Sequence, residues 1–193
     1  PTELFKREEE KLNTKMQSSN LDFYYCGTLS KHKNVYSLLE IFNKWNKDHS
    51  KLSIFTSFSK DDTLGYLGKN KYMEFQGKGI SFFHRLNDLE MSKLKTSMHC
   101  FITFSMHEGF CIPLFNSIEN LSPTISYPLK CLKDYLPRDY VFLDKNDGLE
   151  NIQEKYYSNL QNIINTKNFI KNKCLFYKEN GLELIFKTIN KLN

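Results

Sequence analysis

The sequence contains no alanine, only two valines (Val35 and Val141) and only 8 glycines among its 193 residues. Scarce glycine excludes a collagen-like chain, and the lack of sustained heptads or of any longer period excludes a coiled coil and tandem repeats. No apolar run approaches the ~18–20 residues that a membrane-spanning helix needs. What remains is the composition of a soluble globular domain, so function has to be inferred from pattern.

Metal-binding and disulfide patterns are missing as well. The five cysteines are odd in number, widely spread and never arranged as CxxC, which argues against a disulfide framework and against a zinc site. His32, His49, His99 and His107 are separated and show no metal-ligand spacing. We therefore expect no metal and no other cofactor, reduced thiols, and a cytoplasmic location.

Hydrophobic residues make up 40% of the chain, enough for one domain with a real core. After residue 20 the spacing of the hydrophobic residues switches repeatedly between a period of 2 residues, typical of strands, and one of 3.6 residues, typical of helices. Six short runs predict strands: Phe23–Cys26, Leu52–Phe55, Ile80–Phe83, Cys100–Phe104, Thr124–Tyr127 and Tyr140–Leu143. Apolar stripes predict helices over Val35–Trp45, Met91–Met98, Leu114–Leu121, Leu149–Ile163 and, after a stop at Gly181, Leu182–Leu192. Residues 60–78 predict only a poor helix and a loop.

Strands that alternate with helices indicate βαβ units, and hence an α/β, Rossmann-like, doubly wound parallel sheet covered on both faces. We expect about six strands in the order 3-2-1-4-5-6. Residues 1–20 are predicted to form a helical linker or extension, and residues 21–193 one Rossmann-like domain with C-terminal helices. Such sheets bind ligands at the loops that leave the carboxyl ends of their strands.

The loop after the first predicted strand runs from Gly27 to Asn34. Gly27 permits close backbone approach, the following helix offers free N–H groups, and Lys31 and Lys33 add positive charge, so the loop suits a phosphate. It is neither a GxGxxG nor a Walker sequence, so a dinucleotide dehydrogenase or a mononucleotide kinase is not indicated. An ordinary solvated basic turn remains an alternative interpretation.

The loop after the fourth predicted strand runs from Ser105 to Pro113. Gly109 lies where the backbone must turn sharply, and Pro113 fits the first turn of a helix. Glu108 lies between the strand end and that helix. Its carboxylate can either stabilise the helix N-terminus, by ~0.3–1 kcal/mol, or accept hydrogen bonds from hydroxyl groups of a ligand.

Together the two loops carry the motifs Gly27-x-Leu29-x-x-x-Lys33 and Glu108-Gly109-Phe110-x-Ile112-Pro113. This pair resembles the C-terminal, donor-binding half of retaining GT-B glycosyltransferases of the family four type. That family shows G-R-L-x-x-x-K after the first strand of this half and E-G-F-G-L-P-x-x-E after the fourth. The resemblance covers about residues 23–147. It implies a retaining hexosyltransferase that takes its sugar from a nucleotide-sugar and needs no metal.

The resemblance also implies roles for individual residues. In that family the lysine contacts the donor diphosphate, the first glutamate contacts the transferred sugar, and the second glutamate binds the nucleotide ribose. Lys33 and Glu108 are therefore the catalytic candidates: Lys33 would stabilise charge developing on the leaving nucleoside diphosphate, and Glu108 would contact the transferred sugar. The donor-binding candidates are Gly27, Thr28, Lys33, His84, Glu108, Gly109, Phe110, Cys111 and Asn116, with the backbone amides of residues 109–111 facing the phosphates or the sugar.

The cation pattern departs from the family. The arginine position holds Thr28, so one fixed cation is missing, and Lys31 lies at a different spacing. Cys111 replaces a glycine and adds bulk beside the phosphates. His84 also replaces a glycine, where an imidazole either reaches the donor or covers the end of the sheet.

The ribose position departs too. Asn116 replaces the second glutamate and can hydrogen-bond a ribose only as an uncharged amide, while Glu119 lies almost one helical turn further and could substitute. The main interpretation is a glycosyltransferase donor-binding domain that transfers a sugar to a glycan or lipid-linked acceptor. The alternative is a degenerate, non-catalytic glycosyltransferase-like partner or scaffold protein.

The expected partners follow from this interpretation. They are a nucleotide-sugar, a glycan or glycolipid acceptor, and an N-terminal GT-B domain in the full-length protein, because nothing in this sequence supplies the acceptor half. The net charge is +5, but the lysines are scattered rather than clustered, so nucleic acid is not an expected partner. The mild basic excess fits transient contact with an anionic membrane surface, where lipid-linked acceptors reside.

Overall fold

The computed structural model describes residues 10, 13, 20–45, 50–144, 147 and 149–175. Their elements run β1 (Asp22–Cys26), η1 (Lys31–Lys33), α2 (Val35–Trp45), β2 (Lys51–Thr56), α3 (Lys60–Leu67), α4 (Lys69–Gln76), β3 (Ile80–His84), α5 (Asp88–Ser97), β4 (Cys100–Thr103), α6 (Ile112–Glu119), β5 (Thr124–Ser126), α7 (Lys130–Lys133) and α8 (Leu149–Gln161). Residues 163–175 are helical again. The predicted terminal helix at Leu182–Leu192 and most of the predicted linker over residues 1–20 lie outside the described residues.

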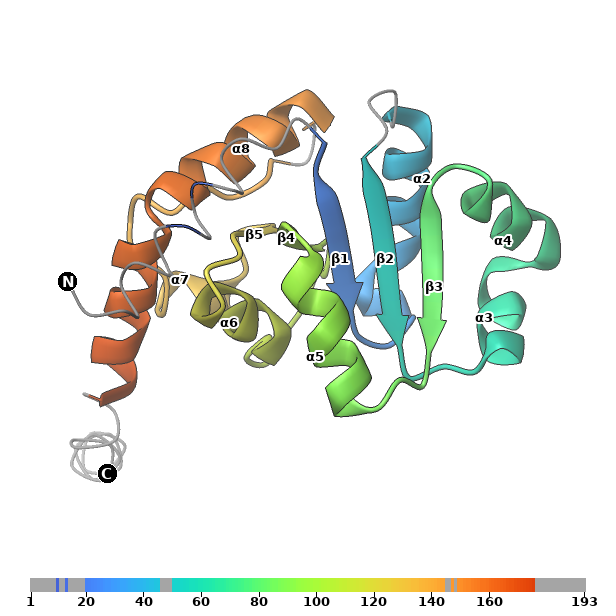
Figure 1. Cartoon of the computed structure of the whole chain (residues 1–193), viewed down its shortest axis with the longest axis horizontal. Helices are drawn as coiled ribbons and strands as arrows, with labels where there is room; N and C mark the ends of the chain where they lie inside the picture. Colours follow the sequence, from blue (N-terminus) through green and yellow to red (C-terminus); the bar gives the residue numbers. More distant parts are fainter. Residues whose placement is uncertain are drawn as a thin grey trace, which may run out of the picture.

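The strands form one parallel sheet in the order β3-β2-β1-β4-β5 (Figure 1). β1 pairs with β2 over five residues, from Asp22 with Lys51 to Cys26 with Phe55, and pairs with β4 on its other side. Strands β2 and β3 are added on one side of β1, and β4 and β5 on the other. The loops after β1 and β4 therefore leave neighbouring strands and meet at the carboxyl edge of the sheet. This is the position where such sheets bind ligands.

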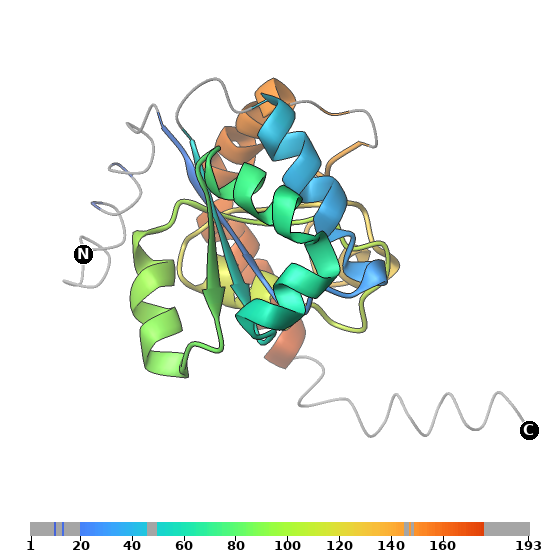
Figure 2. The same cartoon turned by 90° about the vertical axis from the view of Figure 1, so that its right-hand side faces the viewer.

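Helices cover both faces of the sheet. Figure 2 shows α5 on one face and α2, α3 and α4 on the other. Side chains alternate along β1 accordingly: Phe23 packs edge-on against Phe42 of α2, with ring centroids 6.2 Å apart, whereas Tyr24 packs against Phe101 of β4 at 5.3 Å. Nearly every residue of the central strands is buried, as expected for a parallel sheet covered on both faces.

The prediction of a poor helix and a loop over residues 60–78 is wrong, because α3 and α4 occupy this stretch. The N-terminus of α3 is fixed by a capping box: the Asp62 backbone N–H donates to the Ser59 side chain, and the Ser59 N–H donates to the Asp62 carboxylate. Gly68, with φ 78°, separates α3 from α4. The apolar stripe of this stretch is too weak to predict two helices, and their ends are instead set by the capping box and by Gly68.

The prediction of a sixth strand at Tyr140–Leu143 is also wrong for the part of the chain described here. The Val141 N–H donates to Oδ1 of Asn159 on α8, and the Val141 carbonyl accepts from Nδ2 of the same side chain. The N–H of Leu143 donates to the carbonyl of Ser126 in β5, and Tyr140 contacts β5 through its hydroxyl, which hydrogen-bonds Thr124. A side chain on α8 therefore takes the backbone groups that a sixth strand would have used.

Within the described ranges, none of the helices combines the length and the hydrophobicity of a membrane-spanning segment.

Candidate functional site

The loop after β1 begins at a glycine that the structure requires. A Cβ atom on Gly27 would lie 2.7 Å from the Tyr25 hydroxyl oxygen. That hydroxyl is fixed, because Tyr25 is buried and its O–H donates to the carbonyl of Thr28 at 2.8 Å. The Thr28 hydroxyl contacts the Ser30 hydroxyl at 3.2 Å. This part of the loop thus offers hydroxyl and backbone groups but no charge.

Lys33 and Glu108 lie in direct contact, as expected for residues of one site. Nζ of Lys33 is 2.6 Å from Oε2 of Glu108, and the side chains are only 21% and 10% exposed. The two residues are 75 positions apart in the sequence. Charge-assisted hydrogen bonds of this kind are shorter and stronger than neutral ones, and partial burial reduces their screening by solvent. The ion pair therefore joins the two loops through their motif residues.

A backbone contact ties the same loops together. The N–H of Met106, in the loop after β4, donates to the carbonyl of His32 in η1 at 2.9 Å. The charge of Glu108 acts on its buried neighbours: burial first, and the Glu108 carboxylate second, raise the pKa of the Tyr25 phenol and raise the pKa of the Cys111 thiol to about 12. Both groups are therefore neutral at physiological pH.

Cys111 is the N-cap of α6 and has a left-handed backbone, with φ 57° and ψ 56°. This conformation favours glycine, the residue type found there in the family that the motif resembles. The Cys111 side chain is buried rather than pointing into the open site. Phe110 is 41% exposed and stacks on Phe115 with ring centroids 4.5 Å apart. Gly109 has open space where a Cβ would be.

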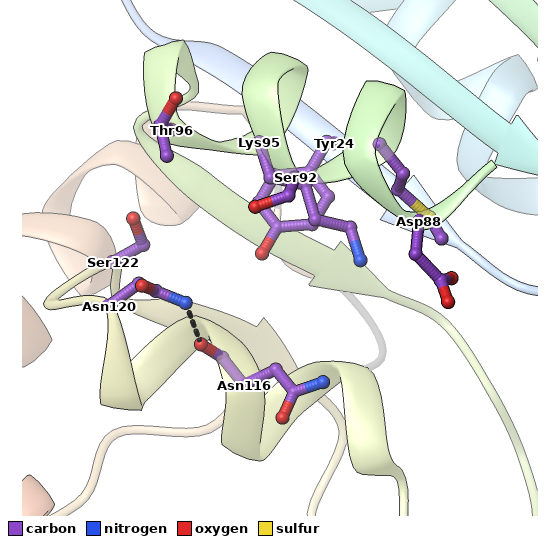
Figure 3. Close-up of a pocket in the computed structure, with 9 residues that line it drawn as sticks. Tyr24, Asp88, Ser92, Lys95, Thr96, Asn116, Asn120 and Ser122 are labelled. Atoms are coloured by element: carbon purple, nitrogen blue, oxygen red, sulfur yellow. Dashed lines mark hydrogen bonds between the residues drawn. The ribbon is translucent and has the colours of Figure 1, made fainter. Parts of the chain in front are cut away.

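Asn116 lies on α6, and the cavity that it lines is lined by neither Lys33 nor Glu108. This cavity has a volume of about 290 Å³ and lies between α5 and α6 (Figure 3). The other lining residues are Tyr24, Asp88, Met91, Ser92, Lys95, Thr96, Asn120 and Ser122. The cavity is polar, and it carries both an ammonium and a carboxylate group.

A second cavity, of about 220 Å³, lies at the carboxyl ends of β1, β2 and β3. Its lining includes Gly27 and Thr28 of the first loop and apolar side chains such as Phe55 and Phe83. Met91 of α5 borders both this cavity and the cavity of Asn116. The two cavities therefore adjoin, one mainly apolar and one polar.

Glu119 forms ion pairs with the helical residues 163–175. Its carboxylate lies 3.4 Å from Nζ of Lys171 and 3.9 Å from Nζ of Lys167. Glu119 is not among the residues that line the cavity of Asn116. These contacts favour a surface ion pair over the ribose-binding role that Glu119 could have taken.

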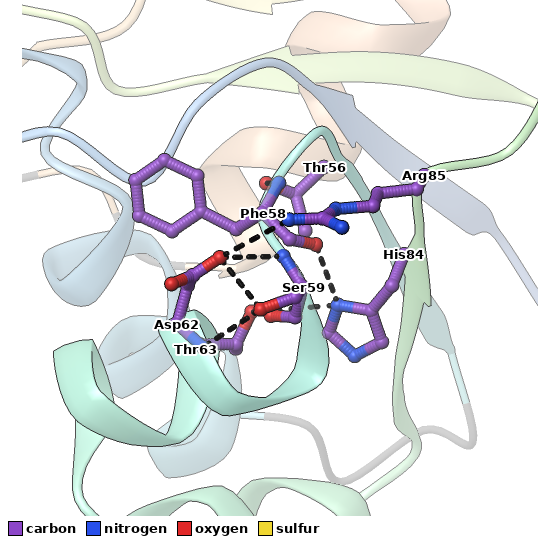
Figure 4. Close-up of polar contacts among 7 residues, drawn as sticks. All are labelled: Thr56, Phe58, Ser59, Asp62, Thr63, His84 and Arg85. Carbon is purple, nitrogen blue, oxygen red and sulfur yellow. Dashed lines mark hydrogen bonds and ion pairs between the residues drawn. The ribbon is translucent and has the colours of Figure 1, made fainter.

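His84 forms part of a hydrogen-bonded corner between β3 and α3 (Figure 4). Its Nδ1 lies 3.2 Å from the Phe58 carbonyl and 3.4 Å from the Thr63 hydroxyl. Beside it, Arg85 pairs with Asp62 at 3.6 Å. His84 lines neither the cavity of Thr28 nor that of Asn116. Of the two interpretations of His84, these contacts favour a residue that covers the end of the sheet.

Sequence reasoning missed two residues at the polar cavity, Tyr24 and Lys95. Nζ of Lys95 lies 5.9 Å from the centroid of the Tyr24 ring. Burial raises the pKa of the Tyr24 phenol, and a hydrogen bond with Ser117 partly offsets this effect. No sequence motif marks either residue, because their contact depends on how α5 crosses β1.

Within the described ranges, no group of three or more His, Cys, Asp and Glu side chains is placed to hold a metal ion. The side chains at the two loops are instead suited to hydrogen bonding and to charge: they include the Lys33 ammonium, the Glu108 carboxylate and hydroxyl groups, beside the N-terminus of α6. Such an arrangement can bind an anion and hydroxyl groups side by side.

No protein-family model matches the sequence, and no curated protein matches it significantly. Solved structures do. The C-terminal domain of LpcC, a glycosyl transferase group 1 family protein from Francisella tularensis, is 14% identical with a TM-score of 0.61, over 86% of this chain and 92% of that one. The catalytic domain of cholesterol-α-glucosyltransferase from Helicobacter pylori is 11% identical with a TM-score of 0.56, over 82% of this chain and 99% of that one.

Longer proteins match through one part of their length. Anabaena Alr3699/HepE, solved in complex with UDP-glucose, is 12% identical with a TM-score of 0.57, over 96% of this chain and 53% of that one. TarM matches over 91% of this chain but only 36% of its own, with 13% identity and a TM-score of 0.57. The chain thus spans about half or less of these proteins. Its five-stranded parallel sheet with flanking helices has the fold of the C-terminal domains of GT-B glycosyltransferases.

Proposed function

We propose that this chain is the nucleotide-sugar-binding domain of a retaining glycosyltransferase of the family four type. The observation that carries the proposal is the contact between Lys33 and Glu108, the lysine and the glutamate of the two motifs, at the carboxyl edge of the sheet. A solvated basic turn, or a glutamate that only stabilises a helix N-terminus, would not require these two side chains to meet. The fold shared with glycosyltransferase domains supports the same conclusion.

In the proposed reaction, Lys33 binds the diphosphate of the donor. The bond between the anomeric carbon and a diphosphate oxygen breaks, and its electron pair stays on the departing nucleoside diphosphate. Lys33 and the backbone N–H groups of residues 109–111, which precede α6, stabilise this growing negative charge. An acceptor hydroxyl oxygen bonds to the anomeric carbon on the same face, and the hydroxyl proton passes to the departing diphosphate. Glu108 accepts hydrogen bonds from hydroxyl groups of the transferred sugar and so positions it. No step requires a metal ion.

The nucleoside would occupy the polar cavity, where the Asn116 amide can hydrogen-bond the ribose. The phosphates would then lie toward the adjoining cavity beside Gly27 and Thr28. The acceptor is a glycan or a lipid-linked sugar held by an N-terminal domain outside this sequence. That proposal agrees with the share of Alr3699/HepE and TarM that the chain spans.

The test is a calorimetric titration of the chain with ADP, GDP, CDP and UDP, each compared with its nucleoside. The proposal predicts measurable binding of at least one diphosphate and weaker binding of the matching nucleoside. The same chain, without an acceptor-binding domain, should transfer no sugar from the corresponding nucleotide-sugar. Failure of all four diphosphates to bind, or turnover at a typical transferase rate of ~1–1000 per second, would contradict the proposal.

A further inference from the structure

The motif residues alone bring no net positive charge to the proposed diphosphate site. Lys33 is already paired with Glu108 at 2.6 Å, and Thr28 stands where the resemblance implies an arginine. A diphosphate carries at least two negative charges, and binding it away from bulk water requires compensating cations. A donor site built on these residues therefore needs a further cation from elsewhere in the fold.

Four other basic side chains come into question. Arg85, Lys31 and Lys130 are exposed to solvent. Lys95 lies in the last turn of α5 and is half-buried. The Asp88 carboxylate lines the same cavity as Lys95, but among the described residues no ion pair joins the two. Lys95 is thus the ammonium that is both held in place and not neutralised.

The position of Lys95 is fixed by its neighbours. Its ammonium lies 5.9 Å from the centroid of the Tyr24 ring, a favourable cation–π arrangement. Helical side chains lean toward the N-terminus of their helix, and α5 begins at the carboxyl edge of the sheet, directly after β3. Figure 3 shows the ammonium end of Lys95 on the side of the Tyr24 ring that faces Asp88, the first residue of α5.

Lys95 also shares a cavity with the proposed ribose residue. It lines the same cavity of about 290 Å³ as Asn116. Met91, one turn before Lys95 on α5, borders the adjoining cavity that includes Gly27 and Thr28. The ammonium therefore faces the space through which a nucleotide would run from its nucleoside to its phosphates.

We propose that Lys95 is the second cation for the donor diphosphate and takes the role of the arginine that Thr28 replaces. The inference rests on the proposed function, because it assigns a residue to that same site.

The test compares Lys95→Met with Lys93→Met, which removes an exposed ammonium from the same helix. Both variants and the parent chain are titrated with the nucleoside diphosphate that the parent binds best and with its nucleoside. Lys95→Met should weaken diphosphate binding about tenfold and leave nucleoside binding within twofold. Lys93→Met should change neither. Melting temperatures check that both variants fold.

A rescue variant separates a charge effect from a packing effect. Adding Thr28→Arg to Lys95→Met should restore most of the lost diphosphate affinity, because it supplies a cation from the first loop. Equal losses for nucleoside and diphosphate, or an unchanged diphosphate affinity in Lys95→Met, would overturn the inference and leave the proposed function standing. If the parent chain binds no diphosphate, the proposed function itself fails, and the two results are distinguishable.

Discussion

Nζ of Lys33 lies 2.6 Å from Oε2 of Glu108, and this contact joins the loops that leave β1 and β4. Both residues belong to the motifs that suggested a donor site, and each is proposed to bind a different part of the donor. Because the Lys33 ammonium already has a carboxylate partner, a diphosphate has to share or displace that partner. Removing the charge of Glu108 should therefore strengthen diphosphate binding, whereas removing Lys33 should weaken it.

Glu108→Gln should bind a nucleoside diphosphate more tightly than the parent chain, by several-fold, because it removes the carboxylate that competes for Lys33. The matching nucleotide-sugar should gain less, because its sugar loses the hydrogen bonds that the carboxylate accepts. Calorimetry with both ligands measures the difference, and Glu154→Gln, an exposed change on α8, is the control. Weaker diphosphate binding in Glu108→Gln would refute the competition.

Gly27→Ala should destabilise the domain by about 1–3 kcal/mol. The new methyl group would lie 2.7 Å from the Tyr25 hydroxyl and would disrupt its hydrogen bond with the Thr28 carbonyl. Gly109→Ala is the matched control, because nothing lies within 4 Å of the added Cβ. Urea unfolding of both variants measures the difference, and equal stability of the two would show that Tyr25 moves without cost.

Asn159→Leu should cost about 2–4 kcal/mol of stability. The Asn159 side chain is buried and hydrogen-bonds the N–H and the carbonyl of Val141 and the carbonyl of Thr124. Leucine removes both partners of Val141, whereas the Thr124 carbonyl still accepts from the Tyr140 hydroxyl. Gln161→Leu, an exposed change on the same helix, should change stability by less than about 0.5 kcal/mol. Similar unfolding midpoints for the two variants would contradict this account of the 140–143 segment.

The stability of the domain should fall as the pH rises above 9, in part because of Cys111. Burial raises the pKa of its thiol from the ordinary value of 9.0 to about 12. Between these values the folded chain keeps a proton that the unfolded chain releases. The folded state then binds more protons, so the free energy of unfolding decreases with pH, by up to about 1.4 kcal/mol per unit from this group.

Urea unfolding at pH 8, 9 and 10 tests the Cys111 contribution. Cys111→Ser retains a small side chain but removes the titrating thiol, so it should show a shallower loss of stability than the parent chain. Iodoacetamide labelling at pH 8 gives a second readout: the exposed Cys174 should react, and the buried Cys111 should be protected in the folded chain. An identical pH slope in both proteins would rule out the proposed titration.

Much of the fold was predictable because its signals are local. Continuous β-rich runs such as Ile80–Phe83 identify five strands, and their alternation with helices predicts the observed strand order. The sixth strand failed because Asn159, far along the chain, satisfies the backbone of Val141. α3 has a weak apolar stripe, yet the Ser59 capping box that begins it is a sequence signal that could have identified it.

The sequence motifs identified one pair of residues in the candidate site. Lys33 and Glu108 belong to these motifs, and the fold brings their side chains into contact. Asn116 and Glu119 could not be placed from spacing alone, because the side on which a helical residue projects depends on how α6 packs. Lys95 could not be identified from the sequence, because its proposed role in diphosphate binding depends on how α5 packs over Tyr24.

The central claim is that Lys33 binds the diphosphate of a nucleotide-sugar donor. Titration of Lys33→Ala with the best-bound nucleoside diphosphate at low salt tests it most directly. Lys51→Ala, an exposed change at the amino end of β2, is the control. The account predicts a tenfold to hundredfold loss of affinity for Lys33→Ala, about 1.5–3 kcal/mol, a smaller loss for Asn116→Ala, and no change for Lys51→Ala. Binding by Lys33→Ala as tight as that of the parent chain would contradict the account.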